Sequence, residues 1–344
     1  MGGNRTKALE TPIFVTGGGG FLGLNLIKAL LQNGHKVVQF SRNYYEELVS
    51  LGVHSIQGDL QDLDAVLKGM KGCKTVIHVA AKAGVWGSWE SFHGPNVIGT
   101  QNVISACKAL GINQLIYTSS PSVVFDGSDQ ENLDESSPYP EHWLANYPAT
   151  KAMGEKLILA ANSPELATVA LRPHLIWGPG DRHLVPRVIA KQKSGRLKLV
   201  GDGSKLVDAV YIDNAVQAHL NALERLYPGS KIAGKSYFIT NHEPQPMKDI
   251  LNGILAAAKL PPVHKKVHPK LAYLIGFLME KLWKTFHTKR EPPITRFVAK
   301  QLSTAHWYNN QAATVELGYE PKVSMAKGFK RLETHFREQQ NKDK

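Results

Sequence analysis

This chain of 344 residues has few cysteines and no long apolar run. Only Cys73 and Cys107 are present, and no apolar signal sequence precedes Thr11. That combination supports neither a disulfide framework nor secretion and favours a reducing, cytoplasmic setting. An apolar run between Leu271 and Met279 is far shorter than the roughly 20 residues of a bilayer span, so it cannot cross a membrane unaided.

Zinc-ligand spacing, aromatic RNA-binding signatures, internal repeats and low-complexity tracts are also absent. The net charge is +12, from 41 Lys and Arg against 29 Asp and Glu, which favours anionic partners such as phosphates or a lipid surface. Because the basic residues are scattered, we expect no nucleic acid partner, and we predict no metal site. The opening letters MGGNRT fit the pattern for myristoylation at Gly2, but so short a pattern often matches by chance.

Runs rich in β-branched and aromatic residues alternate with helical patterns through the first half of the chain. A strand, a helix and a second strand in succession form a right-handed parallel unit. Repetition of that unit predicts an α/β fold, a doubly wound parallel sheet of the Rossmann type with helices on both faces. The main predicted strands are 13–16 (IFVT), 36–40 (KVVQF), 75–80 (TVIHVA), 114–119 (QLIYTS) and 168–172 (TVALR).

The pattern becomes irregular after Arg172, which suggests a second, smaller part. We assign residues 11–171 to the dinucleotide-binding domain and expect residues 205–240 to return to it. Residues 172–204 and 241–335 would form a mainly helical substrate-binding part. The polar segment 336–344 is expected to fray.

Four consecutive glycines in FVTGGGGFLGLNL follow a predicted strand and open a predicted helix. A helix N-terminus presents free backbone N–H groups and positive dipole to an anion. Gly17, Gly20 and Gly23 would let a dinucleotide pyrophosphate lie against the backbone, although their spacing departs from the usual Gly-x-Gly-x-x-Gly. The alternative is a tight turn with close helix packing.

The second predicted strand ends in VVQFSR, where nucleotide-binding folds read the adenosine ribose. No carboxylate occurs from Gly17 to Tyr45, so the usual acceptor for a free 2'-hydroxyl is missing. Ser41 and Arg42 instead suit a 2'-phosphate, which favours NADP over NAD. Asp59, in GDL at residues 58–60 and after a further predicted strand that precedes them, could accept from the adenine amino group or simply cap a turn.

Tyr147 and Lys151, in NYPATKAMGEKLI, are four residues apart and share a helix face. A tyrosine has a reference pKa of about 10, roughly 4 kcal/mol from acid–base work at neutral pH. An ammonium about 4 Å away at an effective dielectric near 20 supplies about that much. A solvated helix pair is the alternative for this spacing alone.

Ser119, Ser120 and Ser122 lie at the end of the predicted strand 114–119 and just beyond it, and ligands gather at the carboxyl ends of strands in doubly wound sheets. A serine there can donate to a substrate oxygen while Tyr147 exchanges the proton. The alternative is a hydroxyl-rich turn.

Taken jointly, these motifs resemble the extended short-chain dehydrogenase/reductases and, within them, the 3β-hydroxysteroid dehydrogenase group. Some segments look most like sterol 3-dehydrogenases, 3-keto reductases and bacterial 2-alkyl-3-oxoalkanoate reductases. The segments that carry the resemblance are TGGGGFLG, GDL, VIHVAA, NVIGTQNV, YTSSPSVVF, YPATK, LRPHLIWGPGD, VYIDNA, REPPIT and LGYEP.

The resemblance implies a set of site residues. Tyr147 becomes the proton donor or acceptor, Lys151 its activator and a ribose ligand, and Ser120 the carbonyl orienter, with Ser122 the alternate. Asn96 would support the site, and His78 and His174 are expected to be packing or supporting residues. The expected cofactor-binding set is Gly17, Gly20, Phe21, Leu22, Gly23, Ser41, Arg42, Asp59, Leu60, Ala80, Tyr147, Lys151, Arg172 and Pro173, the last two on the nicotinamide side.

We therefore expect an NADP-dependent oxidoreductase, with NAD as the alternative cofactor, that interconverts a secondary alcohol and a ketone on a bulky apolar substrate. A sugar-nucleotide epimerase or dehydratase and a non-catalytic cofactor sensor are the alternatives. A homodimer remains open. The segment 270–286 (KLAYLIGFLMEKLWKTF) could line an apolar pocket, lie on a lipid surface, or serve as an ordinary core helix.

Overall fold

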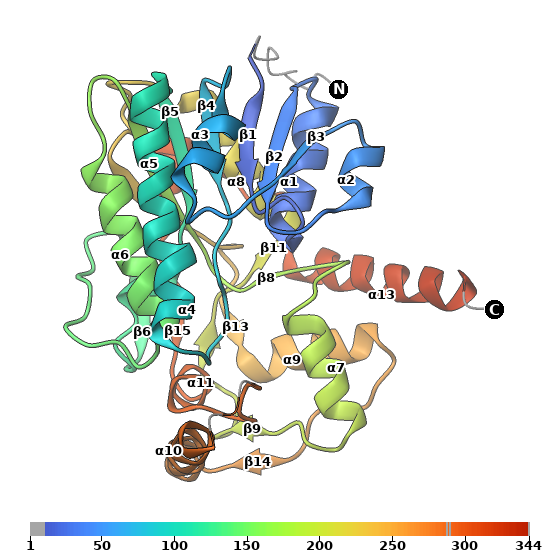
Figure 1. Ribbon diagram of the computed structural model, residues 1–344. Helices are drawn as coiled ribbons and strands as arrows, with labels where there is room; N and C mark the ends of the chain where they lie inside the picture. The colour runs from blue at the N-terminus through green and yellow to red at the C-terminus, as the bar shows by residue number, and fades with distance from the viewer. Residues whose placement is uncertain (1–10, 287, 289, 343–344) are drawn as a thin grey trace.

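The computed structural model describes residues 11–286, 288 and 290–342 (Figure 1). The predicted myristoylation pattern at Gly2 therefore lies outside the described residues. A central sheet of seven strands has the order β12-β7-β5-β4-β1-β2-β3, and every neighbouring pair is parallel. Its strands are β1 (Ile13–Thr16), β2 (Val37–Ser41), β3 (His54–Gln57), β4 (Thr75–His78), β5 (Gln114–Thr118), β7 (Ala167–Pro173) and β12 (Lys235–Ile239).

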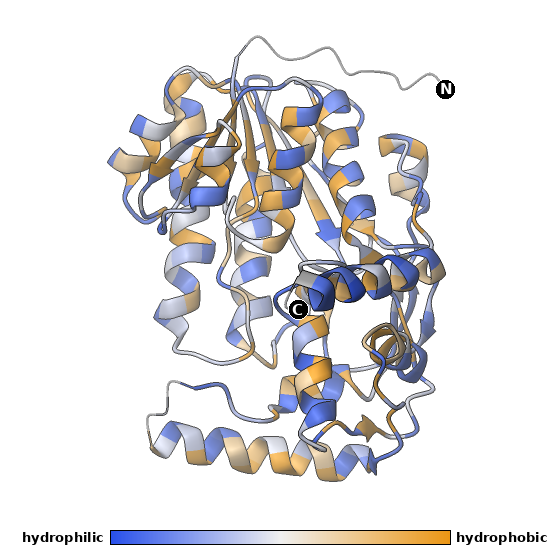
Figure 2. Ribbon diagram, turned by 90° about the vertical axis from the view of Figure 1, so that its right-hand side faces the viewer, coloured by the Kyte–Doolittle hydropathy of each residue, from blue (hydrophilic) through white to orange (hydrophobic). Residues whose placement is uncertain are grey.

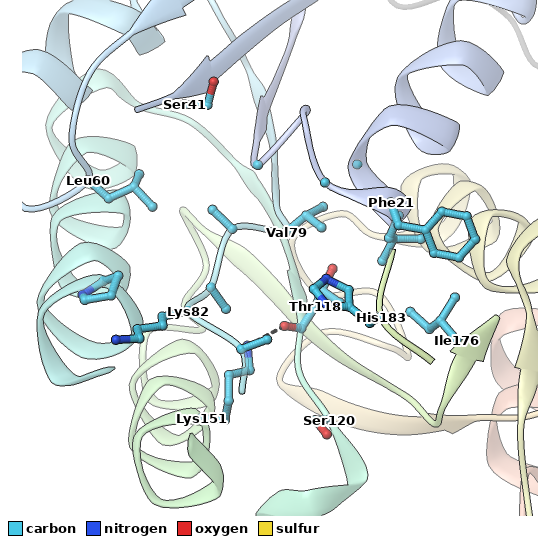
Figure 3. A pocket seen from close by; sticks show the side chains of 18 of the residues that line it. Phe21, Ser41, Leu60, Val79, Lys82, Thr118, Ser120, Lys151, Ile176 and His183 are labelled. Atoms are coloured by element: carbon cyan, nitrogen blue, oxygen red, sulfur yellow. Dashed lines mark hydrogen bonds between the residues drawn. The ribbon is translucent and has the colours of Figure 1, made fainter. Parts of the chain in front are cut away.

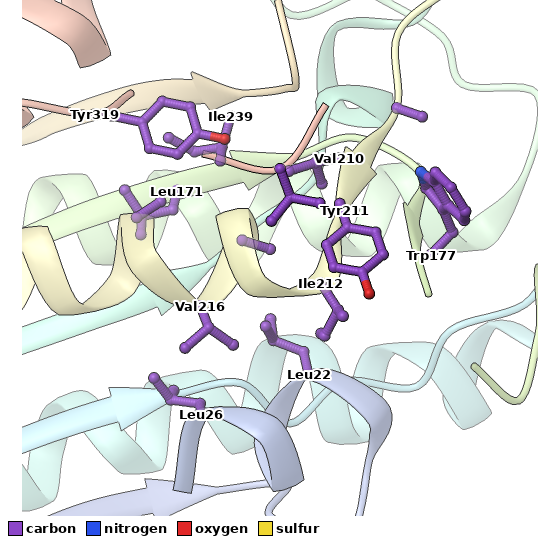
Figure 4. Close-up of a cluster of buried hydrophobic side chains, with 14 of the residues drawn as sticks. Leu22, Leu26, Leu171, Trp177, Val210, Tyr211, Ile212, Val216, Ile239 and Tyr319 are labelled. Atoms are coloured by element: carbon purple, nitrogen blue, oxygen red, sulfur yellow. The ribbon is translucent and has the colours of Figure 1, made fainter. Parts of the chain in front are cut away.

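Helices cover both faces of this sheet, as the alternation along the strands requires. In β1, Ile13 and Val15 belong to the apolar cluster on one face, while Phe14 belongs to the cluster on the other. The first face carries α1 (Phe21–Gln32) and α8 (Ile212–Arg225), whose side chains meet in Figure 4. The second face carries α3 (Leu63–Met70), α5 (Gly99–Leu110) and α6 (Asn146–Ala160). The predicted doubly wound α/β fold is thus confirmed.

The remaining elements gather below the carboxyl edge of the sheet (Figures 1 and 2). A second sheet joins β6 (Gln130–Leu133), β10 (Leu206–Val207), β13 (Gln245–Pro246) and β15 (His306–Tyr308). Two short pairs join β8 (Ile176–Trp177) to β11 (Val210–Tyr211), and β9 (Leu199–Val200) to β14 (Lys266–Val267). The helices of this part are α7 (Leu184–Lys193), α9 (Met247–Ala257), α10 (Pro269–Thr285), α11 (Arg296–Gln301) and α13 (Met325–Lys342), whereas α12 (Gln311–Leu317) packs against β12 and α8.

Short elements connect the strands of the first half: α2 (Glu46–Ser50), α4 (Trp89–His93), the π-helix η1 (Gly94–Ile98) and the 3-10 helix η2 (Pro121–Val124). The wide turn of η1 coincides with Pro95, which has no N–H to donate to the preceding turn. Between Pro269 and Thr285 the helical spacing of the sequence gives one helix, α10. Within the described residues, no helix is both long and apolar enough to cross a membrane.

Two details differ from the sequence prediction. β12 does return to the central sheet within residues 205–240, but β10 joins the second sheet, because two-residue strands carry no readable periodicity. The segment expected to fray from residue 336 continues α13 as far as Lys342. Its Arg, Glu, Gln and Lys residues are good helix formers, which explains why polarity there does not end the helix.

Candidate active site

A cavity of about 490 Å³ opens at the carboxyl ends of β1, β4 and β5, where the strand order reverses direction (Figure 3). This switch point is where open α/β sheets bind nucleotides. The structure brings together there nearly all of the residues predicted to act in catalysis or to bind the cofactor. Its lining includes Gly17, Gly20, Phe21, Leu22, Gly23, Ser41, Arg42, Asp59, Leu60, Ala80, Ser120, Tyr147, Lys151 and Pro173.

The glycines serve both the turn and the cavity. Gly17 has a φ of 74°, and a Cβ there would approach the backbone nitrogen of Ala80 to 2.9 Å. At Gly23, a Cβ would come within 2.2 Å of the Gly17 carbonyl oxygen. Both positions are therefore required by the protein's own packing, as the tight-turn alternative proposed. Gly20 precedes α1, and in the described chain no side chain caps that helix, so its first N–H groups are available to a phosphate. The residues present thus fit a dinucleotide.

The predicted adenosine end lies at the far side of the same cavity, where Figure 3 shows Ser41 and Leu60. Ser41 Oγ donates to the Asn43 carbonyl oxygen at 2.8 Å, which shapes the turn after β2. The Arg42 carbonyl accepts from Gln57 at 2.8 Å, so the backbone of Arg42 is held by the neighbouring strand. Asp59 accepts from the backbone of Gln61 at 3.0 Å, consistent with the turn-capping alternative for the GDL motif.

Tyr147 lies in the first turn of α6 and faces the end of β5. Burial raises the pKa of its hydroxyl, and a hydrogen bond with Ser120 lowers it again in part. Ser120 also contacts the hydroxyl of Ser122 at 2.9 Å. Ser120 lines the cavity whereas Ser122 lies behind it, so the geometry favours Ser120 as the residue that meets a substrate oxygen.

Lys151 is one turn further along α6 and is almost completely buried. Its Nζ donates to the Thr118 carbonyl oxygen at 2.6 Å, a bond drawn in Figure 3, and to the Tyr117 hydroxyl at 2.7 Å. Burial lowers the pKa of the ammonium to about 7, against a smaller raising effect of Glu155. In this arrangement the side chain on which the pKa of Tyr147 depends is Ser120, whereas the sequence argument relied on Lys151.

Asn96, which was expected to support the site, does so through the π-helix η1. Its side-chain oxygen accepts from the backbone N–H of Lys82 at 2.7 Å, and its amide donates to the Lys82 carbonyl at 3.1 Å. The same amide donates to the Thr150 hydroxyl at 3.0 Å. Asn96 therefore joins the segment after β4 to the helix that carries Tyr147 and Lys151.

Arg172 is not where the sequence prediction placed it. Its Nη2 pairs with Glu155 Oε1 at 2.6 Å, both side chains are buried, and the Tyr139 hydroxyl donates to the same carboxylate oxygen. The guanidinium lies 5.0 Å from the ring centre of Phe238, away from the cavity lining. The buried carboxylate of Glu155 requires a cation, and Arg172 supplies it. Of the two residues predicted for the nicotinamide side, Pro173 lines the cavity and Arg172 does not.

The two histidines considered from sequence are both buried. His78 is held between the hydroxyls of Thr16, 2.7 Å from Nδ1, and Thr100, 3.1 Å from Nε2. Burial lowers the pKa of His78 to about 3, so it is neutral at physiological pH. His174 packs edge-on against His306, and burial lowers its pKa well below the usual value.

A second cavity, of about 730 Å³, is lined in part by α10, the segment for which an apolar pocket was one of the sequence-based alternatives, but the other residues of its lining were not predicted. It lies between the segment after β4 and helices α10 and α11, and Lys82 lines both cavities. Asn146, next to Tyr147, belongs to its lining, together with the aromatic residues Trp86, Trp89, Phe92 and Trp283. The three tryptophans were the available signal, but Trp283 lies nearly 200 residues beyond Trp86 and Trp89, and no periodicity joins it to them.

A dinucleotide cavity at the switch point, with a serine, a tyrosine and a lysine at its inner end, defines the class. The protein is an NAD(P)-dependent oxidoreductase of the extended short-chain dehydrogenase/reductase type, which acts on CH–OH groups and the corresponding ketones.

Comparison with known proteins agrees with this class of enzyme. Residues 14–265 match the model of the 3-beta hydroxysteroid dehydrogenase/isomerase family, and the chain belongs to that family. A 2-alkyl-3-oxoalkanoate reductase of Stenotrophomonas maltophilia is 52% identical over 93% of this chain and 98% of its own. The mouse sterol-4-alpha-carboxylate 3-dehydrogenase (decarboxylating) is 34% identical over 94% and 90%. The Bacillus cereus UDP-glucuronic acid 4-epimerase bound to NAD shares the fold, with a TM-score of 0.72, 24% identity, and coverage of 95% of this chain and 99% of that one.

Proposed function

We propose that this enzyme uses NADPH to reduce the ketone of a 3-oxo acid with long apolar chains, of the 2-alkyl-3-oxoalkanoate type. The observation that carries the proposal is the second cavity, which is lined by aromatic side chains and meets the dinucleotide cavity beside Tyr147. Relatives named as 2-alkyl-3-oxoalkanoate reductases support this substrate class.

Lys82 lies where the two cavities meet and is the group we assign to the substrate carboxylate. Its Nζ lies 4.7 Å from the ring centre of Phe92, a residue of the second cavity, and its backbone is fixed by Asn96. In a 3-oxo acid, the carboxylate is two carbons from the ketone. An ammonium at the junction of the two cavities therefore suits such a substrate and would lack a carboxylate partner with a plain ketone.

The reaction needs a hydride, which the bound nicotinamide supplies, and a proton, which this chain supplies. Tyr147 gives its hydroxyl proton to the ketone oxygen, while Ser120 hydrogen-bonds that oxygen and Tyr147. Lys151 would hold the cofactor ribose, and its bonds to the Thr118 carbonyl oxygen and the Tyr117 hydroxyl fix its ammonium at the inner end of the cavity. Asn96 keeps α6 and the segment after β4 in register during these steps.

The preference for NADPH rests on the turn after β2. Ser41 and Arg42 line the adenosine end, and the chain has no carboxylate between Gly17 and Tyr45 to accept from a free 2'-hydroxyl. A guanidinium at this position suits a 2'-phosphate. NAD is the alternative cofactor, because structural neighbours of this chain are bound to it.

A 3β-hydroxysteroid or sterol acid is the second candidate substrate, favoured by the family match and by a cavity volume that accommodates fused rings. Steady-state turnover distinguishes the candidates. We expect NADPH consumption with a 2-alkyl-3-oxo acid and NADP⁺ reduction with the 2-alkyl-3-hydroxy acid. Turnover confined to 3-ketosteroids supports the second candidate, and isomerisation of a UDP-sugar without net change in cofactor contradicts both.

A further inference from the structure

Three polar side chains form a row beneath the carboxyl edge of the central sheet, just inside the candidate active site. Thr16, His78 and Tyr117 are partners in the register of β1, β4 and β5. Residues paired in this way project from the same face of a sheet, so the row faces α5 and α6. All three are at most 1% exposed. Polar groups buried so deeply require hydrogen-bond partners.

Hydrogen bonds join this row to both helices that cover it. His78 is held between the hydroxyl oxygens of Thr16, 2.7 Å from Nδ1, and of Thr100 on α5, 3.1 Å from Nε2. Thr100 also hydrogen-bonds the hydroxyl of Tyr117. That hydroxyl accepts from Nζ of Lys151, on α6, at 2.7 Å. The lysine of the candidate active site is thus connected to three strands of the sheet through neutral side chains.

The direction of these hydrogen bonds follows from Thr100. Its single hydroxyl proton goes to the Asn96 carbonyl oxygen, at 2.8 Å. The oxygen of Thr100 therefore accepts from His78 Nε2–H and from the hydroxyl of Tyr117. Because the Tyr117 proton points to Thr100, the Tyr117 oxygen is left as an acceptor for Lys151.

This chain of hydrogen bonds orients groups and does not carry protons to water. At its far end, Thr16 Oγ1 accepts from the backbone N–H of Ala80 at 3.0 Å, and Thr16 is completely buried. His78 is neutral, because burial lowers its pKa to about 3. With no route to solvent at that end, what the chain can set is the position of the Lys151 ammonium.

Helix α6 lies against the Tyr117 hydroxyl with no side chain between them. A Cβ at Gly154, less than one turn beyond Lys151, would approach both the Tyr117 hydroxyl oxygen and the Asn96 carbonyl oxygen to 2.7 Å. The absence of a side chain at Gly154 therefore allows this close approach. The Thr118 carbonyl oxygen, 2.6 Å from Lys151 Nζ, is the second acceptor of the ammonium (Figure 3).

We propose that Tyr117 is a positioning residue for the reaction. Its hydroxyl and the Thr118 carbonyl oxygen take two of the three N–H donors of Lys151, which leaves one N–H for the cofactor ribose. Thr100 and His78 keep the hydroxyl of Tyr117 turned as an acceptor. This inference rests on the proposed role of Lys151 at the ribose.

A double-mutant cycle on the full chain tests whether Tyr117 acts through Lys151, with NADPH binding followed by fluorescence. Lys151→Met alone should weaken NADPH binding. Tyr117→Phe should weaken it roughly threefold to tenfold in the wild-type background and hardly at all in the Lys151→Met background. Equal losses in both backgrounds would give Tyr117 a purely structural role and overturn the proposal. Unchanged affinity of Lys151→Met would overturn it as well.

Tyr319→Phe is the matched control for the loss of a buried tyrosine hydroxyl. The hydroxyl of Tyr319 donates to the Thr240 carbonyl oxygen at 2.9 Å, and Tyr319 lines neither cavity. NADPH binding should be the same in this variant and in the wild type. A loss equal to that of Tyr117→Phe would show that any such hydroxyl matters for folding alone, and would contradict the proposal.

Variants of Thr100 test the same chain without changing the tyrosine. Thr100→Val removes the acceptor of the Tyr117 proton, which can then turn toward the ammonium and repel it. NADPH affinity and kcat should fall together, while KM for a 2-alkyl-3-oxo acid hardly changes. Thr100→Ser keeps the hydroxyl and should rescue the affinity for NADPH, and equal losses in the two variants contradict the proposal. Absence of turnover in the wild type would count against the proposed function and leave the binding cycle intact.

Discussion

The Nζ of Lys151 donates to the hydroxyl of Tyr117 at 2.7 Å, beneath the end of β5, where water does not reach either group. The ammonium also lies 4.0 Å from the centre of the Tyr117 ring. Burial of a cation among neutral groups is costly, and it lowers the pKa of Lys151 to about 7. The lysine of this site is therefore close to half-protonated at neutral pH.

This lowered pKa predicts how stability depends on pH. Between pH 7 and the ordinary lysine pKa of 10.5, the unfolded chain binds a proton at Lys151 that the folded chain releases. The free energy of unfolding should therefore rise with pH across this window, by up to about 1.4 kcal/mol per pH unit. Urea unfolding of the wild type and Lys151→Met at several pH values measures it. The free energy of unfolding of the wild type, relative to that of Lys151→Met, should increase as pH rises. A difference that stays constant with pH contradicts the lowered pKa of Lys151.

Tyr147→Phe removes the proton-carrying oxygen and keeps the ring. Turnover should fall by roughly 10² or more, while the dissociation constant for NADPH changes little. Steady-state kinetics and a fluorescence titration of the cofactor measure the two quantities. Near-normal turnover would show that another group handles the proton.

Ser120→Ala removes the hydrogen bond that lowers the pKa of Tyr147. We expect turnover to fall roughly tenfold or more, and the pH at which alcohol oxidation reaches half its maximal rate to move upward. Ser122→Ala is the matched control, because Ser122 contacts Ser120 but does not line the cavity. A larger effect of Ser122→Ala on the pH profile would reverse the roles of the two serines.

Arg42→Ala should weaken NADPH binding by about 1.5 to 3 kcal/mol through the lost phosphate pair, and leave NADH binding nearly unchanged. Arg42→Lys keeps the positive charge but lacks the planar guanidinium, so its affinity for NADPH should lie between those of the wild type and Arg42→Ala. Dissociation constants for both cofactors test this. Equal losses of affinity for NADPH and NADH, or a preference of the wild type for NADH, would show that Arg42 does not bind the 2'-phosphate.

Lys82→Met should raise KM for a 2-alkyl-3-oxo acid roughly tenfold or more, by the loss of a charge-assisted hydrogen bond. The matching ketone without a carboxylate provides the comparison, and its KM should hardly change. Should both substrates lose equally, or should NADPH binding weaken instead, Lys82 serves the cofactor and not the substrate carboxylate.

The sequence predicted the central sheet well because its strands, apart from the half-exposed β3, are largely buried and stand out as short apolar runs between amphipathic helices. Ser120 was predicted at the carboxyl edge of the sheet because ligand sites gather at the carboxyl ends of parallel strands, whereas the role of Tyr147 came from its spacing to Lys151 and from the family resemblance. Sites made of two-residue strands and distant loops carry no such periodicity. The second cavity depends on Trp86 and Trp283 from opposite ends of the chain, and only the fold joins them.

Arg172 shows a different limit. Arg172 lies near the end of β7, between the cofactor cavity and the protein interior. The residue type alone does not show whether its guanidinium faces the cofactor or an interior carboxylate. One signal was available, because Tyr147, Lys151 and Glu155 are spaced by four and share a helix face. A carboxylate on that face points inward with the catalytic pair, and a buried carboxylate needs a cation close by. Arg172 is the cation that the structure supplies.

The position of β12 at the edge of the sheet affects how the chain folds during its synthesis. Every residue of β7 is buried in the finished protein, and β12, its outer neighbour, begins only at Lys235. On the ribosome, at roughly 5 to 20 residues per second, β7 therefore waits several seconds with an unpaired apolar edge. The face of α1 that carries Leu22 and Leu26 is likewise uncovered until α8 emerges. A fragment that ends before β12 should therefore aggregate instead of forming a small cofactor-binding domain.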